Sequence, residues 1–336
     1  MKTTWISICF TAVLAVPLHA APAAGPSGYH LARTVPLAGD DGWDDLALNQ
    51  ATRRLFITHG THVLVLNLAD FSVAGDIPNT PRVHGVAFAP DAGFTSNGGD
   101  NTVSVFDLST LQTTKRIAVG TGPDAIVYDP ASNEVLTFNG GSKDATVIDA
   151  KTQTVVGTIP LGGKPEFAAP DGNGKVYVNI EDTSQIVAID TKTLTVANRW
   201  PLAPCQEPSG LAIDTAHNRL FAVCHNKMMA VVDALTGKIV ATPAIGEGPD
   251  GAGFDPQTQL AFSSNGEGTL TVVREASHDD FKVLDTVQTQ PRARTMKLDT
   301  ESHDVFLVTA DFNPPTAPGV RPTVVPGTFR LLVYAK

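Results

Sequence analysis

The 336-residue sequence lacks the short motifs that identify many enzymes. It has three cysteines and four methionines. It contains no Gly-rich phosphate loop, His-Glu-x-x-His, Cys-x-x-Cys-His or Gly-x-Ser-x-Gly motif. P-loop nucleotide binding, zincin-type proteolysis, covalent haem attachment and nucleophile-elbow hydrolysis are therefore not indicated. No segment sustains helical periodicity over 11 or more residues, which argues against a helical fold.

Charge is also sparse and of one dominant sign. Charged residues make up 17% of the chain, and the formal net charge is −10. An acidic surface argues against nucleic-acid binding, which needs clustered Lys and Arg. Apolar residues at 42% supply a large core, and 29 glycines and 24 prolines supply many turns. This composition is typical of short strands joined by turns.

The first twenty residues have the composition of a secretory signal. Lys2 precedes a short apolar run that ends at Leu18-His19-Ala20. A positive start, an apolar centre and a small residue before the cut are the marks of such a signal. The alternative is a membrane anchor, but the run is shorter than the ~20 residues that span a bilayer. We expect cleavage of residues 1–20, export to the periplasm or beyond, and no later membrane span.

Two cysteines remain after this segment. Cys9 lies in the expected signal, which leaves Cys205 and Cys224. In an exported protein, such a pair indicates one disulfide. Two buried thiols are the alternative interpretation.

The rest of the chain repeats itself. The stretch GPDGAGFDPQTQLAFSSNG at 248–266 has a near copy, GPDAIVYDPASNEVLTFNG, at 122–140. Looser copies bring the total to seven, and such a period indicates a repeat architecture. The residues that match the Asp after Gly-Pro lie 40 to 44 positions apart: Asp44, His84, Asp124, Glu166, Ser209, Asp250 and Arg294.

Each copy has strand patterns rather than helical ones. Short runs of β-branched and apolar residues alternate with turn formers, as in NTVSVFD at 101–107. Four antiparallel strands per repeat of this length form one blade of a β-propeller. The last copy, ending in TFRLLVYAK, has no fourth strand, and residues 29–36 resemble one. We therefore predict an all-β, seven-bladed propeller over residues 28–336, a single domain whose last blade is closed by the N-terminal strand.

The repeat resembles the YVTN-type, YncE-like family of seven-bladed propellers. The shared elements are Pro249-Asp250-Gly251, Ala89-Pro90-Asp91, Phe94-Thr95-Ser96-Asn97 and NTVSVFD at 101–107. The resemblance covers nearly all of the chain after the signal, although the strand-end tetrad is degenerate in the other copies. It implies the propeller fold more firmly than any function, because the family includes binding modules and relatives with enzymatic activity.

Blade geometry predicts one polar mouth of the central channel. First strands start, and second strands end, at the same face of a propeller. We therefore expect the repeated position and the second-strand ends to share one entrance. The expected mouth residues are Asp44, His59, His84, Asp124, Glu166, Glu181, Ser209, His225, Asp250, Glu267 and Arg294.

Carboxylates and imidazoles gathered at a confined mouth suit a divalent metal ion. We predict His84, Glu166 and Asp250 as metal ligands, with the choice of metal open. The alternative is structural: an Asp at this position can accept backbone N–H bonds in the connecting loop.

Three functions remain open at this stage. The first is an exported, monomeric binding protein that holds a small ligand, a metal ion or a protein partner at the mouth. The second is a metal-dependent lyase or lactone hydrolase, with His84, His225 and Glu166 as candidate catalytic residues. The third, single-stranded nucleic-acid binding, ranks last because it needs a basic groove with stacking aromatics.

One segment breaks the repeat. Residues 311–329 contain five prolines and replace a short turn in the seventh copy. Such a segment is stiff and non-helical. We expect it over the same mouth, as a lid or docking loop, or else as a passive excursion.

Overall fold

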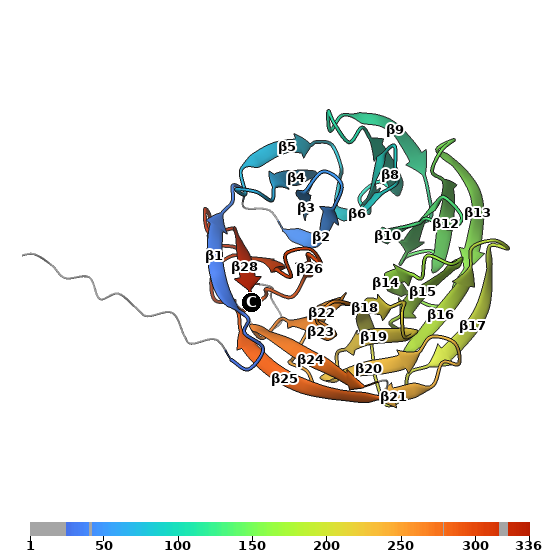
Figure 1. The fold of residues 1–336 in the computed structure, drawn as a ribbon. Coiled ribbons are helices and arrows are strands. Elements are labelled where there is room, and N and C mark those ends of the chain that lie inside the picture. The colour runs from blue at the N-terminus through green and yellow to red at the C-terminus, as the bar shows by residue number, and fades with distance from the viewer. Residues whose placement is uncertain (1–24, 40–41, 278, 316–321) are drawn as a thin grey trace, which may run out of the picture.

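The computed structural model is a closed ring of seven four-stranded antiparallel sheets around a central channel (Figure 1). It describes residues 25–39, 42–277, 279–315 and 322–336. The all-β, seven-bladed propeller predicted from the sequence is thereby confirmed. The expected signal, residues 1–20, lies outside the described residues.

Each blade runs from an innermost first strand to an outermost fourth strand. Blades one to three comprise β2 (Trp43–Asn49), β3 (Arg54–His59), β4 (His62–Asn67) and β5 (Val73–Ile77); β6 (Val83–Phe88), β7 (Gly93–Asn97), β8 (Thr102–Phe106) and β9 (Thr113–Ala118); and β10 (Pro123–Asp129), β11 (Glu134–Asn139), β12 (Asp144–Asp149) and β13 (Thr154–Pro160). Blades four and five comprise β14 (Pro165–Pro170), β15 (Lys175–Ile180), β16 (Gln185–Asp190) and β17 (Thr195–Pro201); and β18 (Pro208–Asp214), β19 (Arg219–Cys224), β20 (Met228–Asp233) and β21 (Ile239–Ala241). Blades six and seven comprise β22 (Pro249–Asp255), β23 (Leu260–Asn265), β24 (Thr269–Ser277) and β25 (Asp280–Gln288); and β26 (Met296–Leu298), β27 (Val305–Thr309), β28 (Arg330–Ala335) and β1 (His30–Pro36).

The ring is closed by strands from both ends of the chain. Strand β1 pairs with β28, from His30 opposite Ala335 to Pro36 opposite Arg330. The seventh sheet therefore has the order β1-β28-β27-β26, as predicted. Pairing the two ends covers β28, which would otherwise be a free sheet edge.

The core lies between neighbouring blades. Middle strands such as β4 and β8 carry runs of Val, Leu and Phe, which are buried because both faces of each sheet are covered. The Phe56 ring of blade one, for example, lies 4.8 Å from that of Phe88 and 5.9 Å from that of Phe106 in blade two. Each such fully buried side chain contributes roughly 1.5–3 kcal/mol. Packing between blades therefore holds the channel open at a fixed width.

Six first strands begin with the same irregularity. Their register with the second strand shifts after the first residue, as between Val83 and Val86 or between Pro123 and Ile126. The residue after that first position, such as His84 or Asp124, lies inside the bulge. Since a bulge redirects side chains out of the regular alternation, this device turns the repeated position toward the channel.

The far ends of the first strands are joined across blades by buried aspartates. Asp299, at the end of blade seven's first strand, accepts a hydrogen bond from Gln50 at 3.0 Å and pairs with the Arg53 guanidinium of blade one, with a 3.1 Å contact to its Nη1. His303 similarly reaches Asp255 in the preceding blade, with 2.7 Å between Nδ1 and Oδ2. These polar links supplement the apolar packing at the face opposite the mouth.

Cys205 and Cys224 form a disulfide with a Cα–Cα distance of 5.7 Å. The sequence prediction of one disulfide is therefore confirmed over two free thiols. No helix in the described part of the chain is long and apolar enough to cross a membrane.

Candidate functional site

A cavity of about 620 Å³ opens at one end of the channel. Its wall is built mainly from the second residue of each first strand and from the loops that precede these strands. We call it the polar mouth. Nine of the predicted residues line it: Asp44, His84, Asp124, Glu166, Glu181, Ser209, His225, Asp250 and Arg294.

Two predicted mouth residues lie elsewhere. His59 is buried behind the cavity wall, where its ring packs 4.6 Å from that of Phe329. Glu267 is exposed in the β23–β24 turn, where it accepts a hydrogen bond from Thr269 at 2.9 Å. Ends of second strands are thus less reliable predictors of channel-facing side chains than starts of first strands.

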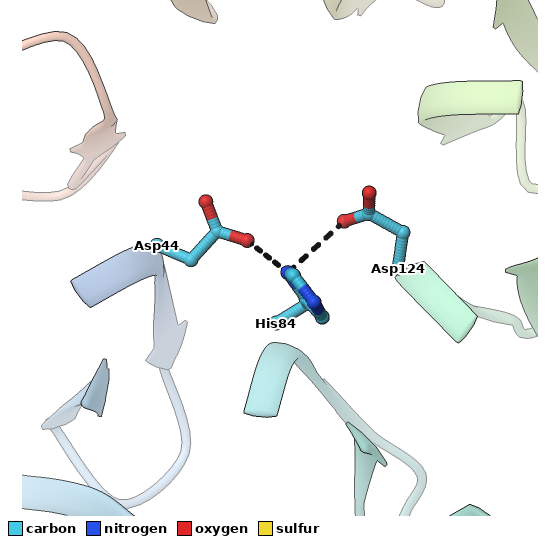
Figure 2. Close-up of side chains that lie close together, drawn as sticks. All are labelled: Asp44, His84 and Asp124. Carbon is cyan, nitrogen blue, oxygen red and sulfur yellow. Dashed lines mark hydrogen bonds and ion pairs between the residues drawn. The ribbon is translucent and has the colours of Figure 1, made fainter. Parts of the chain in front are cut away.

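Three consecutive blades bring Asp44, His84 and Asp124 together (Figure 2). Nδ1 of His84 donates a hydrogen bond to Asp44 and lies 3.6 Å from Oδ1 of Asp124. The ligand atoms of all three residues lie within 4.8 Å of one another. All three side chains are half-buried, so the cluster remains in contact with the cavity.

The electrostatics of this cluster favour positive charge. Burial lowers the pKa of His84, but the Asp44 hydrogen bond and the charges of Asp124 and Asp44 outweigh it, so the pKa is raised overall. Burial also raises the pKa of Asp124, and His84 opposes that rise. A cation placed among the three would therefore replace protons that the cluster otherwise holds.

Gly98 leaves the space that the His84 ring occupies. A Cβ atom at this position would lie 2.8 Å from Cδ2 and Nε2 of the imidazole. Gly98 directly follows Asn97, the last residue of β7, so the second strand sets one boundary of the ring's position.

Across the mouth, Lys164 joins two glutamates. Its ammonium lies 2.6 Å from Glu166 and also contacts Glu181. Burial raises the pKa of Glu166 to about 8. Lys164 lowers this pKa, whereas the nearby charges of Asp124 and Glu181 add to the rise. Glu166 thus faces the cavity with a carboxyl group that binds a proton more tightly than a free glutamate does.

Asp250 and Arg294 form a second charged pair, with 3.3 Å between Oδ2 and Nε. Burial raises the pKa of Asp250 to about 7, and Arg294 opposes this shift. Burial likewise raises the pKa of Asp45, the neighbour of Asp44 in the cavity wall, to about 7. Its backbone N–H donates to Thr58 at 2.8 Å.

The predicted metal ligands His84, Glu166 and Asp250 are not one cluster among the described residues. Glu166 faces Lys164 and Asp250 faces Arg294, so each of these acids has a cation of its own. His84 instead groups with Asp44 and Asp124. Side chains from neighbouring blades lie closer together than side chains from blades across the ring. This proximity decides which residues form a cluster.

Sequence reasoning missed three charged residues of the wall: Asp45, Arg82 and Lys164. Arg82 and Lys164 come two residues before the repeated position, in the loops that enter blades two and four. The sequence could have indicated these two residues, because a loop that leads into a first strand lies at the mouth. These loops are not alike between copies, so the repeat alignment did not single them out.

The proline-rich segment starts and ends at this face. Phe312 pairs with Val324 in an isolated bridge, and the ring of Phe329 stacks 4.9 Å from Trp43, which lines the polar mouth. Residues 316–321 lie outside the described residues, so the expectation of a lid or docking loop remains a prediction.

Comparison with known proteins gives structural matches only. No family model matches the chain, and no curated protein matches it in sequence. A chain of the structure titled "Kuenenia stuttgartiensis Hydrazine Synthase" aligns with a TM-score of 0.68 at 16% identity, over 81% of this chain and 94% of that one. A chain of "Crystal Structure of Mitotic Checkpoint Complex" aligns with a TM-score of 0.74 at 12% identity, over 100% of this chain and 99% of that one. At such identities the matches show the β-propeller fold alone.

Proposed function

We propose that the protein is an exported propeller of the YVTN-type, YncE-like kind that binds a divalent cation at the polar mouth. The observation that carries this proposal is the convergence of Asp44, His84 and Asp124 from three blades at the edge of a 620 Å³ cavity. Residues 40 positions apart in the sequence meet there, so the cluster depends on the packing of three consecutive blades.

The charge balance of the wall supports a cation. Among the described residues, six acidic side chains line the cavity against three fixed cations: Asp44, Asp45, Asp124, Glu166, Glu181 and Asp250 against Arg82, Lys164 and Arg294. Burial raises the pKa of Asp45, Glu166 and Asp250, and a nearby cation would favour the charged forms of these acids. Lys164 contacts Glu166 and Glu181, and Arg294 pairs with Asp250. The acids that remain include Asp44 and Asp124, which share one imidazole. A bound cation would relieve their repulsion.

The donor set narrows the choice of ion. One imidazole with two carboxylates suits Zn²⁺ or Mn²⁺ better than Ca²⁺, which takes six to eight oxygens. Three protein ligands leave coordination positions open on the cavity side. The cavity has the volume of a small-molecule site, so a small ligand with an anionic or carbonyl oxygen would fit on the ion.

Calorimetric titration of the metal-free protein with Zn²⁺, Mn²⁺ and Ca²⁺ tests the proposal. We expect Asp44→Asn, His84→Ala and Asp124→Asn each to weaken binding of the preferred ion by about tenfold or more, as loss of a ligand does. His225→Ala is the matched control, because His225 lines the same cavity outside the cluster, 3.5 Å from Glu207. Equal affinity of the His84→Ala variant and the wild type would refute this site.

A second candidate function, a metal-dependent lyase or lactone hydrolase, is favoured by one observation. Glu166 faces the cavity with its pKa raised to about 8, so it can donate a proton at neutral pH. If the site is catalytic, Glu166→Gln should abolish turnover of a responsive lactone while leaving metal affinity unchanged. A lactone and uronate screen with and without EDTA decides between binding and catalysis.

Export is part of the proposal, and the disulfide supports it because such bonds persist in oxidising compartments. Fractionation of cells that express the full chain should place the mature protein outside the cytoplasm, beginning at residue 21. A chain retained in the cytoplasm with residues 1–20 intact would contradict this part.

A further inference from the structure

A second group of metal-ligating side chains lies at the opposite end of the blades. Asp214 is the last residue of β18, His217 lies in the turn that follows, and Glu275 lies near the end of β24. Their ligand atoms lie within 4.8 Å of one another. Asp214 is five residues along β18 from Ser209 of the polar mouth, about 17 Å at the rise of an extended strand. The two groups are therefore separate sites.

Asp214 is held in place by its own turn. Oδ1 accepts the backbone N–H groups of Ala216 and His217 at 2.9 and 3.3 Å, and Oδ2 lies 2.6 Å from Nδ1 of His217. This carboxylate is almost wholly buried, with 1% of its side chain exposed. Its position and that of the imidazole are thus fixed by local hydrogen bonds before any ligand binds.

Glu275 is held by fewer contacts than Asp214, with its carboxyl group close enough to Asp214 to share a hydrogen bond. Its side chain is 3% exposed, and its Oε1 lies 4.0 Å from Nδ1 of His217. Its Oε2 is buried without a hydrogen-bond partner among the described residues. A buried carboxylate oxygen left without a partner is costly. A long side chain that ends in this way, beside a second carboxylate and an imidazole, points to a missing ligand.

The surrounding charges are compatible with a cation. Burial, the Asp214 charge and a hydrogen bond to Asp214 raise the pKa of Glu275 to about 7, whereas His217 and Arg219 lower it. The Arg219 guanidinium, itself buried, pairs with Asp233 at 2.8 Å and with Asp279 at 3.1 Å. These two carboxylates partly offset the positive charge that Arg219 brings to the group.

We propose that Asp214, His217 and Glu275 form a second divalent-cation site, of the zinc type, which fastens the long hairpin of blade six to blade five. Imidazole nitrogen and carboxylate oxygen are both zinc ligands, and the exposed side of His217 leaves the fourth position to water. The hairpin formed by β24 and β25, nine residues each, extends along the outer side of blade five toward β21 (Figure 1). An ion at its inner edge would add a second link between this hairpin and blade five, beside the Arg219–Asp279 pair.

The test uses full-length protein with the polar mouth disabled by Asp44→Asn, His84→Ala and Asp124→Asn. Titration with Zn²⁺, and with Co²⁺ as a visible-absorption probe, should show about one remaining site. Adding His217→Ala or Glu275→Gln should weaken it by about tenfold or more and remove the Co²⁺ ligand-field bands. Zn²⁺ should also raise the melting temperature of the parent protein and not that of the Glu275→Gln variant.

Glu134→Gln is the matched control. Glu134 also has a buried carboxylate oxygen without a hydrogen-bond partner, at the same end of blade three, and it belongs to neither group. Its variant should bind Zn²⁺ as the parent does. The Glu275→Gln variant should fold in EDTA, since an amide removes a buried acid, and Glu275→Asp provides a second variant that keeps the charge. Absence of Zn²⁺ binding by the mouth-disabled protein, or unchanged affinity in its Glu275→Gln form, overturns the proposal.

Discussion

Three carboxyl groups of the polar mouth hold protons in the folded state that they would lose in the unfolded chain. Burial raises the pKa of Asp45 and Asp250 to about 7 and that of Glu166 to about 8. Their unfolded values lie near 4. Between these values the folded state binds more protons, so the free energy of unfolding decreases as pH rises through the window.

This reasoning predicts a pH-dependent melting temperature. The metal-free protein should melt several degrees lower at pH 8.5 than at pH 5.5, and the Asp250→Asn, Glu166→Gln double variant should show a weaker slope. The raised pKa of His84 acts in the same direction, since its stabilisation is lost as pH rises through its folded value. Calorimetry across the range measures the slope. A melting temperature that rises with pH would show that these groups are ionised in the fold.

Gly98→Ala should displace the His84 imidazole without disturbing the ring. The added Cβ would lie 2.8 Å from Nε2 of His84 and 3.3 Å from the Pro123 carbonyl oxygen. We expect cation affinity at the mouth to decrease about tenfold, with the free energy of unfolding changed by less than about 1 kcal/mol. Gly42→Ala is the control, because Gly42 lines the same cavity and a Cβ there meets nothing within 4 Å. Equal losses in both variants would argue against a role for the ring position.

Nine of the side chains that reach the mouth could be predicted, but their pairing could not. The repeat placed Asp44, Asp124 and Asp250 at one position of each blade, and the bulged first strands keep that position facing the channel. The contacts of Lys164 with Glu166 and Glu181 depend on side-chain reach across a loop and a neighbouring strand end. No repeat position indicates contacts of this kind. The predicted metal ligands therefore came from blades that are not neighbours in the ring.

At the scale of elements, the turn after β2 and the end of β26 join the first and last blades. Arg53 is one-third exposed, whereas the Asp299 carboxylate it contacts is 1% exposed. Burial raises the pKa of Asp299, but the hydrogen bonds from Arg53 and Gln50 lower it by more. The pKa of Asp299 therefore lies well below its usual range. The contribution of this carboxylate is therefore present above pH 4 and is lost only in strong acid.

Arg53→Met should accordingly destabilise the ring by about 1.5–3 kcal/mol, the value of hydrogen bonds to a charged group. Urea denaturation at pH 7 measures the loss. Lys227→Met is the control, since its 2.7 Å pair with Glu247 is exposed on both sides and screened by solvent. A loss no larger than that of the control would mean that apolar packing alone holds the seam.

At the scale of the whole molecule, removal of β1 should open the ring. A chain that begins at residue 38 lacks the partner of β28, and each lost backbone hydrogen bond costs roughly 0.5–1.5 kcal/mol. We expect a lower melting temperature and self-association through the exposed edge, measured by calorimetry and light scattering. A chain that begins at Gly25 is the control, and a peptide of residues 25–39 added in trans should restore the monomer. An unchanged, monomeric truncation would contradict the closure.

The fold was predictable because the repeat carries it seven times. Each copy shows the same order of apolar runs and turns, and the missing last strand in TFRLLVYAK was matched by the spare one near the N-terminus. The length of the β24–β25 hairpin was not predicted, because its added residues lie outside the repeating pattern. The same holds for Glu275 and its neighbours, which meet only where that hairpin passes blade five.

The seam between β1 and β28 also sets an order of events. A polypeptide leaves the ribosome with its N-terminal segment first, and β28, which β1 needs as a partner, is made long after it. Blade seven therefore cannot form until β28 has left the ribosome, and every earlier nascent intermediate keeps an unfinished sheet. Such a chain stays in a state that a chaperone can hold until β28 is released.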